Sequence, residues 1–208
     1  MRPHRPPALR FLSIEPGLAV YRADFLFYAI ALTCLALALL THPMDAPLLG
    51  WVMAGAAAWT LLEYLLHRFV LHGLSPFRDW HAEHHGRPDA RISAPTLLTA
   101  GLFTLLLLPM GWWMGRWPAL ALGFGLLAGY FCYAVIHHVL HRPLPPTAAR
   151  PGRSLLRRQR RWHARHHQRA SPARGELGTP GHYGVTSAFW DHIFRTGDRP
   201  RPRPRRAP

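Results

Sequence analysis

The sequence contains no lysine, few acidic residues and only two cysteines, and each shortage narrows the kinds of protein it can be. All 25 basic residues among the 208 are arginines, against 10 acidic residues. Cys34 and Cys132 lie inside apolar runs, with no Cys-x-x-Cys or zinc-finger spacing, which argues against a disulfide framework and a thiolate metal site. We interpret both cysteines as small core residues. Arginine used alone, with abundant Ala, Leu, Pro and Gly, is typical of a GC-rich bacterial genome.

Long apolar runs are abundant, and they predict the fold class. Four segments cover about residues 25–41, 48–66, 97–115 and 118–136, each long enough for a helix to cross a hydrocarbon core of about 30 Å. No small-residue cleavage site follows the first segment, so we expect a retained anchor rather than a signal peptide. Gly55 and the Gly125-x-x-x-Gly129 spacing would let helices approach closely. The prediction is an all-α integral membrane protein with four transmembrane helices.

The arginines are distributed unevenly around these segments. Four lie in residues 1–22, four in 67–95 and sixteen from 142 onward, whereas 41–47 has none and the turn near 116 has one. Positive residues favour the cytoplasmic side, so we expect both termini in the cytoplasm, in a bacterial inner membrane. The expected organisation is a cytoplasmic arm over 1–22, a membrane-embedded domain over 23–197 and a disordered basic tail over 198–208.

A formal net charge of +15 raises the possibility of nucleic-acid binding. The charge is concentrated beside apolar segments of spanning length, which favours anionic lipid headgroups as its partner and not nucleic acid. Residues 153–169 are expected to form a helix on the membrane surface.

Histidine is over-represented, with 15 in the chain, and the pattern Trp-His-x-x-His-His occurs twice, at 80–85 and 162–167. Ten histidines form four groups after the second and fourth apolar segments. They are His67, His72, His81, His84, His85, His137, His141, His163, His166 and His167. Because positions i, i+3 and i+4 share a helix face, His-x-x-His-His points three imidazoles the same way. His67 and His72 diverge by about 140° on an ideal helix, so they need a helix end or bend to converge.

The groups follow the same order in each half of the chain, so each half offers five imidazoles at a cytoplasmic helix end. Ten ligands are too many for one catalytic zinc, which takes three from the protein. We therefore predict a cytoplasmic helical cap that holds two metal ions between the halves. Imidazole also suits iron, copper and nickel, so the spacing does not name the metal. His4, His42 and His192 are interpreted as surface residues.

Several other residues have two readings. Glu63, near the end of an apolar segment, can accept a ring N–H of a histidine or pair with Arg68, and we favour the first. Asp191 has the same two alternatives. His138 is expected to support a ligand or lie on the surface. Whether Tyr133 and Tyr183 border a substrate tunnel or are ordinary interfacial aromatics stays open.

With these groups in place, the chain resembles the fatty acid hydroxylase superfamily of integral-membrane, non-haem di-iron enzymes, over about residues 55–197. EYLLHRFVLH (63–72), HAEHHGRPDARISAP (81–95), YAVIHHVLH (133–141) and HARHH (163–167) resemble its four histidine boxes. GHYGVTSAFWDHIFRTG (181–197) resembles its closing signature. The second box and the signature are more similar to the fatty acid 2-hydroxylases than to the carotenoid hydroxylases. The family usually has asparagine where this chain has His182, whose role is left open.

The resemblance implies O2-dependent hydroxylation of the acyl chain of a membrane lipid or fatty acid, at two iron ions held by the ten histidines. Zinc could replace iron during purification. A separate electron donor, ferredoxin-like or cytochrome-like, is expected. A sterol or carotenoid substrate at the same site, or desaturation, remains an alternative. A non-enzymatic haem or metal-binding membrane protein is a further one, although haem in such proteins is bound by histidine pairs within the spanning helices.

Overall fold

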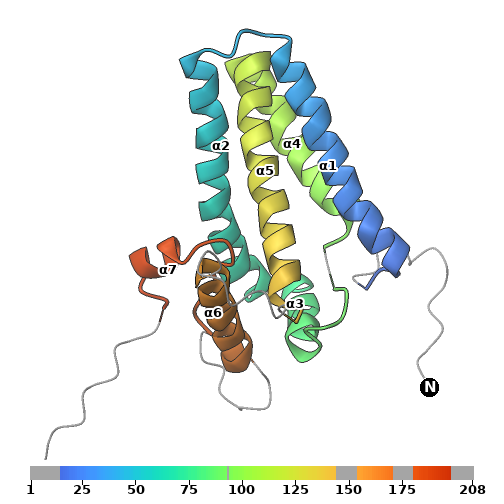
Figure 1. The fold of residues 1–208 in the computed structure, drawn as a ribbon, viewed down its shortest axis with the longest axis vertical. Coiled ribbons are helices and arrows are strands. Elements are labelled where there is room, and N and C mark those ends of the chain that lie inside the picture. The colour runs from blue at the N-terminus through green and yellow to red at the C-terminus, as the bar shows by residue number, and fades with distance from the viewer. Residues whose placement is uncertain (1–14, 93, 144–153, 171–179, 198–208) are drawn as a thin grey trace, which may run out of the picture.

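The chain folds into four long helices that run side by side, with shorter helices gathered at one end (Figure 1). The computed structural model describes residues 15–92, 94–143, 154–170 and 180–197, and all regular structure in these ranges is helical. The long helices are α1 (Leu18–Leu40), α2 (Ala46–Leu65), α4 (Thr96–Met114) and α5 (Arg116–Leu140). Each is long and apolar enough to cross a membrane. The predicted fold class is thus confirmed.

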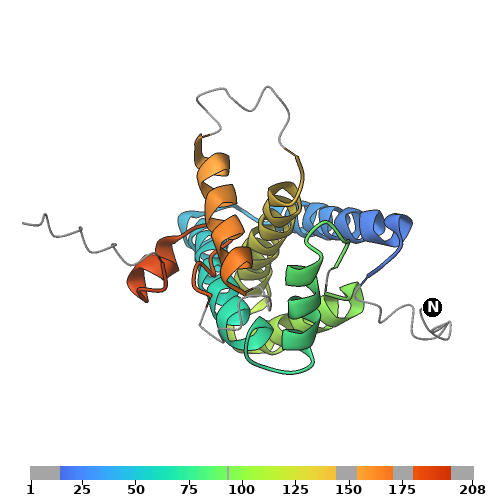
Figure 2. The same ribbon diagram turned by 90° about the horizontal axis from the view of Figure 1, so that it is seen from below.

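The shorter helices are α3 (Phe77–Gly86), α6 (Ser154–Ala170) and α7 (Phe189–Ile193). They lie at the end of the bundle opposite the α1–α2 connection (Figures 1 and 2). Helix α6 confirms the helix expected near 153–169. Helix α1 begins at Leu18, within the range expected for the N-terminal arm. Residues 1–14 and the predicted tail, 198–208, lie outside the described residues.

Helices α2 and α5 form the closest helix pair, and glycines make their approach possible. A Cβ on Gly55 would meet the carbonyl oxygen of Leu122, and a Cβ on Gly125 would meet that of Val52. The two backbones are therefore in direct contact, as small residues at a membrane-helix interface allow. This contact confirms the prediction that small residues let the helices approach closely.

The surface of the bundle corrects one prediction. Cys34 and Cys132 are both exposed, so they are not core residues of the protein. Helix α4 has no buried residue, and Trp112 near its end is 94% exposed. Along a spanning helix an apolar side chain can face lipid as well as protein, so an apolar run does not predict a protein core.

Candidate metal centre

Helix α2 changes its winding where the first histidines lie. Residues Leu66–Leu71 form η2, a π-helical turn, and His72 caps its end. In a π-helix the backbone hydrogen bonds join residues five apart, so His67 and His72 come to the same side of the turn. Their rings stack with centroids 5.2 Å apart. The turn supplies the bend that their spacing required.

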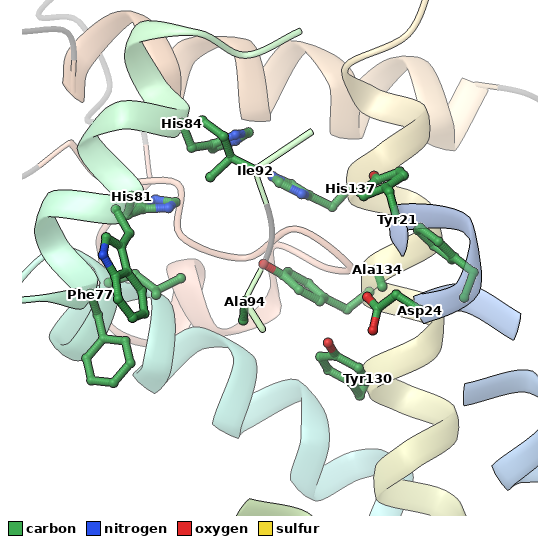
Figure 3. Close-up of a pocket in the computed structure, with 14 residues that line it drawn as sticks. Tyr21, Asp24, Phe77, His81, His84, Ile92, Ala94, Tyr130, Ala134 and His137 are labelled. Atoms are coloured by element: carbon green, nitrogen blue, oxygen red, sulfur yellow. The ribbon is translucent and has the colours of Figure 1, made fainter. Parts of the chain in front are cut away.

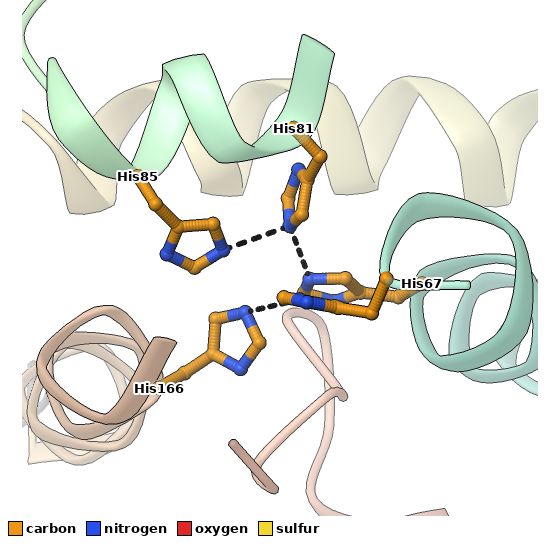
Figure 4. Close-up of side chains that lie close together, drawn as sticks. His67, His81, His85 and His166 are labelled. Atoms are coloured by element: carbon orange, nitrogen blue, oxygen red, sulfur yellow. Dashed lines mark hydrogen bonds between the residues drawn. The ribbon is translucent and has the colours of Figure 1, made fainter. Parts of the chain in front are cut away.

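The ten predicted histidines form two clusters, in each of which one nitrogen per ring lies within 4.8 Å of the other four. The His67 cluster comprises His67, His72, His81, His85 and His166. The His84 cluster comprises His84, His137, His141, His163 and His167. Figure 4 shows four rings of the His67 cluster converging from η2, α3 and α6. The clusters adjoin, since the ring centroids of His85 and His167 are 4.2 Å apart.

The clusters do not follow the two halves of the chain, and each contains histidines from both. His84 joins the histidines of the second half, and His166 joins those of the first. On a helix, residue i+4 lies about 40° from residue i, whereas i+3 lies about 60° to the other side. His81 and His85 therefore face one cluster, and His84 between them faces the next. The same geometry separates His166 from its neighbours on α6.

The rings of both clusters are buried or half-buried, and burial keeps the imidazoles neutral. Loss of water lowers the pKa of His84 and His166 to about 3, and that of His72 and His141 to about 4. Burial also lowers the pKa of His81 well below its usual value, and neighbouring histidines add to the shift. A neutral imidazole keeps a lone pair on one ring nitrogen, which is the form that binds a metal ion.

The environment of the ring nitrogens fits a bound metal ion. Both ring nitrogens of His84 are buried with no hydrogen-bond partner in the described part of the chain. The Nε2 atoms of His163 and His141 face each other at 2.8 Å. Buried polar atoms normally have partners, and five converging imidazoles are a suitable ligand set for iron or zinc. Each cluster can therefore hold one ion.

The segment Gly181–Thr186, which we call the carbonyl loop, holds two rings of the His67 cluster. Nδ1 of His67 donates to the carbonyl oxygen of Tyr183 at 2.5 Å, and Nδ1 of His166 donates to that of Gly181 at 2.7 Å. With the ring proton on Nδ1, Nε2 is free to face the cluster. Backbone carbonyls commonly orient metal-binding histidines in this way.

Asp191 holds the carbonyl loop from within α7. Its carboxylate is fully buried, and it accepts from the backbone N–H groups of Tyr183 at 3.0 Å and Gly184 at 2.8 Å. The hydroxyl of Thr196 donates to the same carboxylate at 2.6 Å. Asp191 had been expected to accept a ring N–H of a histidine. It instead holds the loop whose carbonyl groups contact the histidines.

Glu63 of α2 holds the other end of the loop. It accepts from the backbone N–H groups of Val185 at 2.6 Å and Thr186 at 2.9 Å, and from the Thr186 hydroxyl at 2.5 Å. The expected partner of Glu63 was either a histidine ring or Arg68, and these backbone and hydroxyl groups are neither. The guanidinium of Arg68 donates to the hydroxyl of Tyr64 instead.

The histidine spacing gives no hint of the backbone of this loop. Gly181 and His182 have φ values of 65° and 55°, in the left-handed region. This turn lets the carbonyls on either side of His182 reach the same cluster. Histidine and asparagine enter the left-handed region more often than most residues. That preference accounts for His182 at a position where the resembled family usually has asparagine.

The other predicted residues lie around the clusters. His138 belongs to neither, and its Nδ1 is 2.8 Å from the hydroxyl of Tyr21 on α1. Tyr183 is buried against the rings of His67 and His166, with both ring centroids 5.7 Å from its own. Tyr133 lines two cavities that lead to the clusters.

The larger of the two cavities that Tyr133 lines, which we call the apolar groove, lies between α2, α4 and α5. Its volume is about 360 Å³. Its walls are mostly apolar, with polar atoms from Thr99, Tyr130, Tyr133 and Glu63, and it reaches the His67 cluster at His67. Three leucines of its lining, Leu66, Leu102 and Leu106, are 42 to 57% exposed on the outer surface of the bundle. The groove is therefore open on the side where lipid would lie.

A smaller cavity of about 150 Å³ adjoins the groove and shares Tyr130 and Tyr133 with it. Figure 3 shows that rings from both clusters border this cavity, namely His81, His84 and His137. The carboxylate of Asp24 on α1 also borders it. An apolar chain in the groove would thus reach the His67 cluster, and the adjoining smaller cavity leads on to His84 and His137 of the other cluster.

Comparison with known proteins identifies relatives of this arrangement. The fatty acid hydroxylase family model matches residues 52–196. The ceramide very long chain fatty acid hydroxylase SCS7 of Saccharomyces cerevisiae is 34% identical, over 68% of this chain and 36% of that protein. The dihydroceramide fatty acyl 2-hydroxylase FAH2 of Arabidopsis thaliana is 33% identical, over 72% of this chain and 62% of its own length.

A solved structure is also similar. The hydroxylase domain of full-length scs7p superimposes with a TM-score of 0.66 and 25% sequence identity, covering 86% of this chain and 67% of that one. The chain spans between about a third and three fifths of the length of the curated relatives named above.

Proposed function

Because the chain belongs to the fatty acid hydroxylase family, we propose that it hydroxylates the acyl chain of a membrane lipid or fatty acid at a di-iron centre. The observation that carries the proposal is an apolar groove that reaches the His67 cluster and continues into a smaller cavity beside both five-histidine clusters. A hydrolytic zinc site would need three protein ligands, not two sets of five.

The groove supports an acyl chain as the substrate. Its apolar lining from α2, α4 and α5 suits a hydrocarbon tail, and its open side would admit the tail directly from the bilayer. The polar end of the lipid would then lie near the smaller cavity, beside His84 and His137. SCS7 is named for ceramide and FAH2 for dihydroceramide, so an acyl chain carried by such a lipid or by a free fatty acid is the proposed substrate class.

The chain's residues would position the reaction and keep water from it. Iron ions held by the ten histidines would supply the O2 and C–H bond chemistry. One oxygen atom enters the lipid and the other leaves as water, so each turnover consumes two electrons and two protons. We propose a separate ferredoxin-like or cytochrome-like donor of these electrons. The exposed arginines of α6, among them Arg158, Arg161 and Arg165, suit the docking of an acidic one.

We also propose that the clusters face the cytoplasm of a bacterial inner membrane. The arginine-rich segments 67–95 and 154–170 both lie at the cluster end of the bundle, whereas 41–47 lies at the other. Positive residues favour the cytoplasmic side. A reporter fused after residue 90 should therefore read as cytoplasmic and one after residue 45 as external. A reversed pair of readings would contradict this orientation.

The function is tested by profiling lipids in cells that express the chain, with O2 and a reductant available. A lipid should gain the mass of one oxygen atom on its acyl chain. A variant with His163→Ala and His167→Ala should make none, because two of five ligands of the His84 cluster are gone. His138→Ala, outside both clusters, is the matched histidine control and should retain product.

Other products would point to the alternatives. Loss of two hydrogen atoms would identify a desaturase. An oxidised sterol or carotenoid with unaltered acyl chains would overturn the substrate class. A haem absorption band in the purified protein, with no lipid change, would favour a non-enzymatic carrier.

A further inference from the structure

The two clusters have the same number of imidazoles but different surroundings. In the His67 cluster the carbonyl loop holds His67 and His166 through Nδ1. In the His84 cluster Nδ1 of His163, His167 and His84 is buried without a hydrogen-bond partner among the described residues, whereas in the His67 cluster this holds for one ring, His85. Within the described residues, no hydrogen bond to Nδ1 orients these three rings.

Burial separates the clusters further. Four of the five rings are buried in the His67 cluster, against two of five in the His84 cluster. His141, one of the half-buried rings, borders a small surface pocket beside Asp89 and Arg142. Water and small chelators would thus reach the His84 cluster more easily.

We infer that the carbonyl loop makes the two metal sites inequivalent, so that the His67 cluster binds its ion first and releases it last. The inference rests on the proposal that both clusters bind metal. Ligands that are already oriented lose less freedom on binding. Hydrogen-bonded supports of ligating histidines typically change metal affinity by about 10- to 100-fold.

Asp191 and Glu63 are positioning residues in this scheme, because they fix the loop that orients the rings. Because their hydrogen-bond partners differ, replacing each carboxylate by its amide should have different effects. Each oxygen of Asp191 faces a backbone N–H, of Tyr183 or Gly184, so the NH2 group of Asp191→Asn must oppose one of them. Among the described residues, the second oxygen of Glu63 has one partner, the Thr186 hydroxyl, which can accept as well as donate. Glu63→Gln can therefore keep the loop in place.

The test uses Co²⁺ as the probe, bound to the metal-stripped full chain and followed by its visible absorption as a chelator removes it. The unaltered chain should bind two ions and release them in a fast and a slow phase. His72→Ala should remove the slow phase and His141→Ala the fast one, which assigns the phases to the clusters.

Asp191→Asn should speed the slow phase by about 10- to 100-fold and leave the fast phase unchanged, which also shows that the chain is folded. Glu63→Gln should change neither phase by more than a few-fold. Should Asp191→Asn fail to fold, Thr196→Val, which removes one hydrogen bond to Asp191, should speed the slow phase to a smaller degree.

Release in one phase from the unaltered chain, or equal acceleration of both phases in these variants, would overturn the inference while leaving the di-metal proposal intact. Binding of no Co²⁺ at all would instead contradict the proposed function.

Discussion

Replacing His166 with alanine is expected to abolish lipid hydroxylation and to empty the cluster built mainly from the first half of the chain. Replacing His84 is expected to abolish it by emptying the other cluster. Each histidine is one of five converging ligands, and both ions are needed for the proposed chemistry. Metal content should fall from about two ions per chain toward one, and product should fall to the level of cells lacking the chain.

Double variants test directly whether His84 and His166 each belong to the cluster formed mainly by the other half of the chain. His166→Ala combined with His72→Ala should cost no more metal than either change alone, because both residues serve the His67 cluster. His166→Ala combined with His141→Ala should leave the chain almost metal-free. The opposite pattern, with His166 grouping with His141, would show that each half of the chain binds its own ion.

Replacing Gly125 with alanine is expected to prevent stable packing of α2 against α5. The added Cβ would lie against the carbonyl oxygen of Val52 and within 2.8 Å of the backbone nitrogen of Ala56. Backbone atoms cannot rotate away as a side chain can, so the helices must separate. Overpacking of this kind typically costs about 1–3 kcal/mol. Thermal unfolding in detergent, read by size-exclusion chromatography, should show less monodisperse protein and a lower midpoint.

Gly101→Ala on α4 is the matched control, because a Cβ there meets no atom within 4 Å. The same added methyl group should leave the unfolding midpoint unchanged or slightly higher. If both substitutions lowered the midpoint equally, glycine flexibility rather than close packing would be the reason for Gly125.

The sequence predicts those features that depend on composition or local spacing. Segment length and apolarity reveal the four long helices, and recurring histidines reveal which residues come together. Even the bend at η2 is foreseeable, because residues five apart, such as His67 and His72, cannot converge on an α-helix. These inferences need only helix geometry and the thickness of a bilayer.

Features that depend on the relative placement of helices are not predictable in this way. The cluster to which His84 and His166 each belong depends on how α3 and α6 face each other. The spacing of histidines in the sequence does not determine this. The partners of Glu63 lie more than a hundred residues away, on a loop without helical periodicity. The core assignment of Cys34 failed because apolar character does not distinguish a lipid contact from a protein contact.

The open side of the apolar groove has a consequence for kinetics. Under the proposed function, an acyl chain that slides in from the bilayer would not pass through water, so the rate would depend on the density of the substrate within the membrane plane. Adding inert lipid to vesicles of fixed total substrate should then slow turnover by surface dilution, whereas diluting the same vesicles in buffer should not. The rate would then saturate with the mole fraction of substrate in the bilayer and not with its concentration in the whole sample.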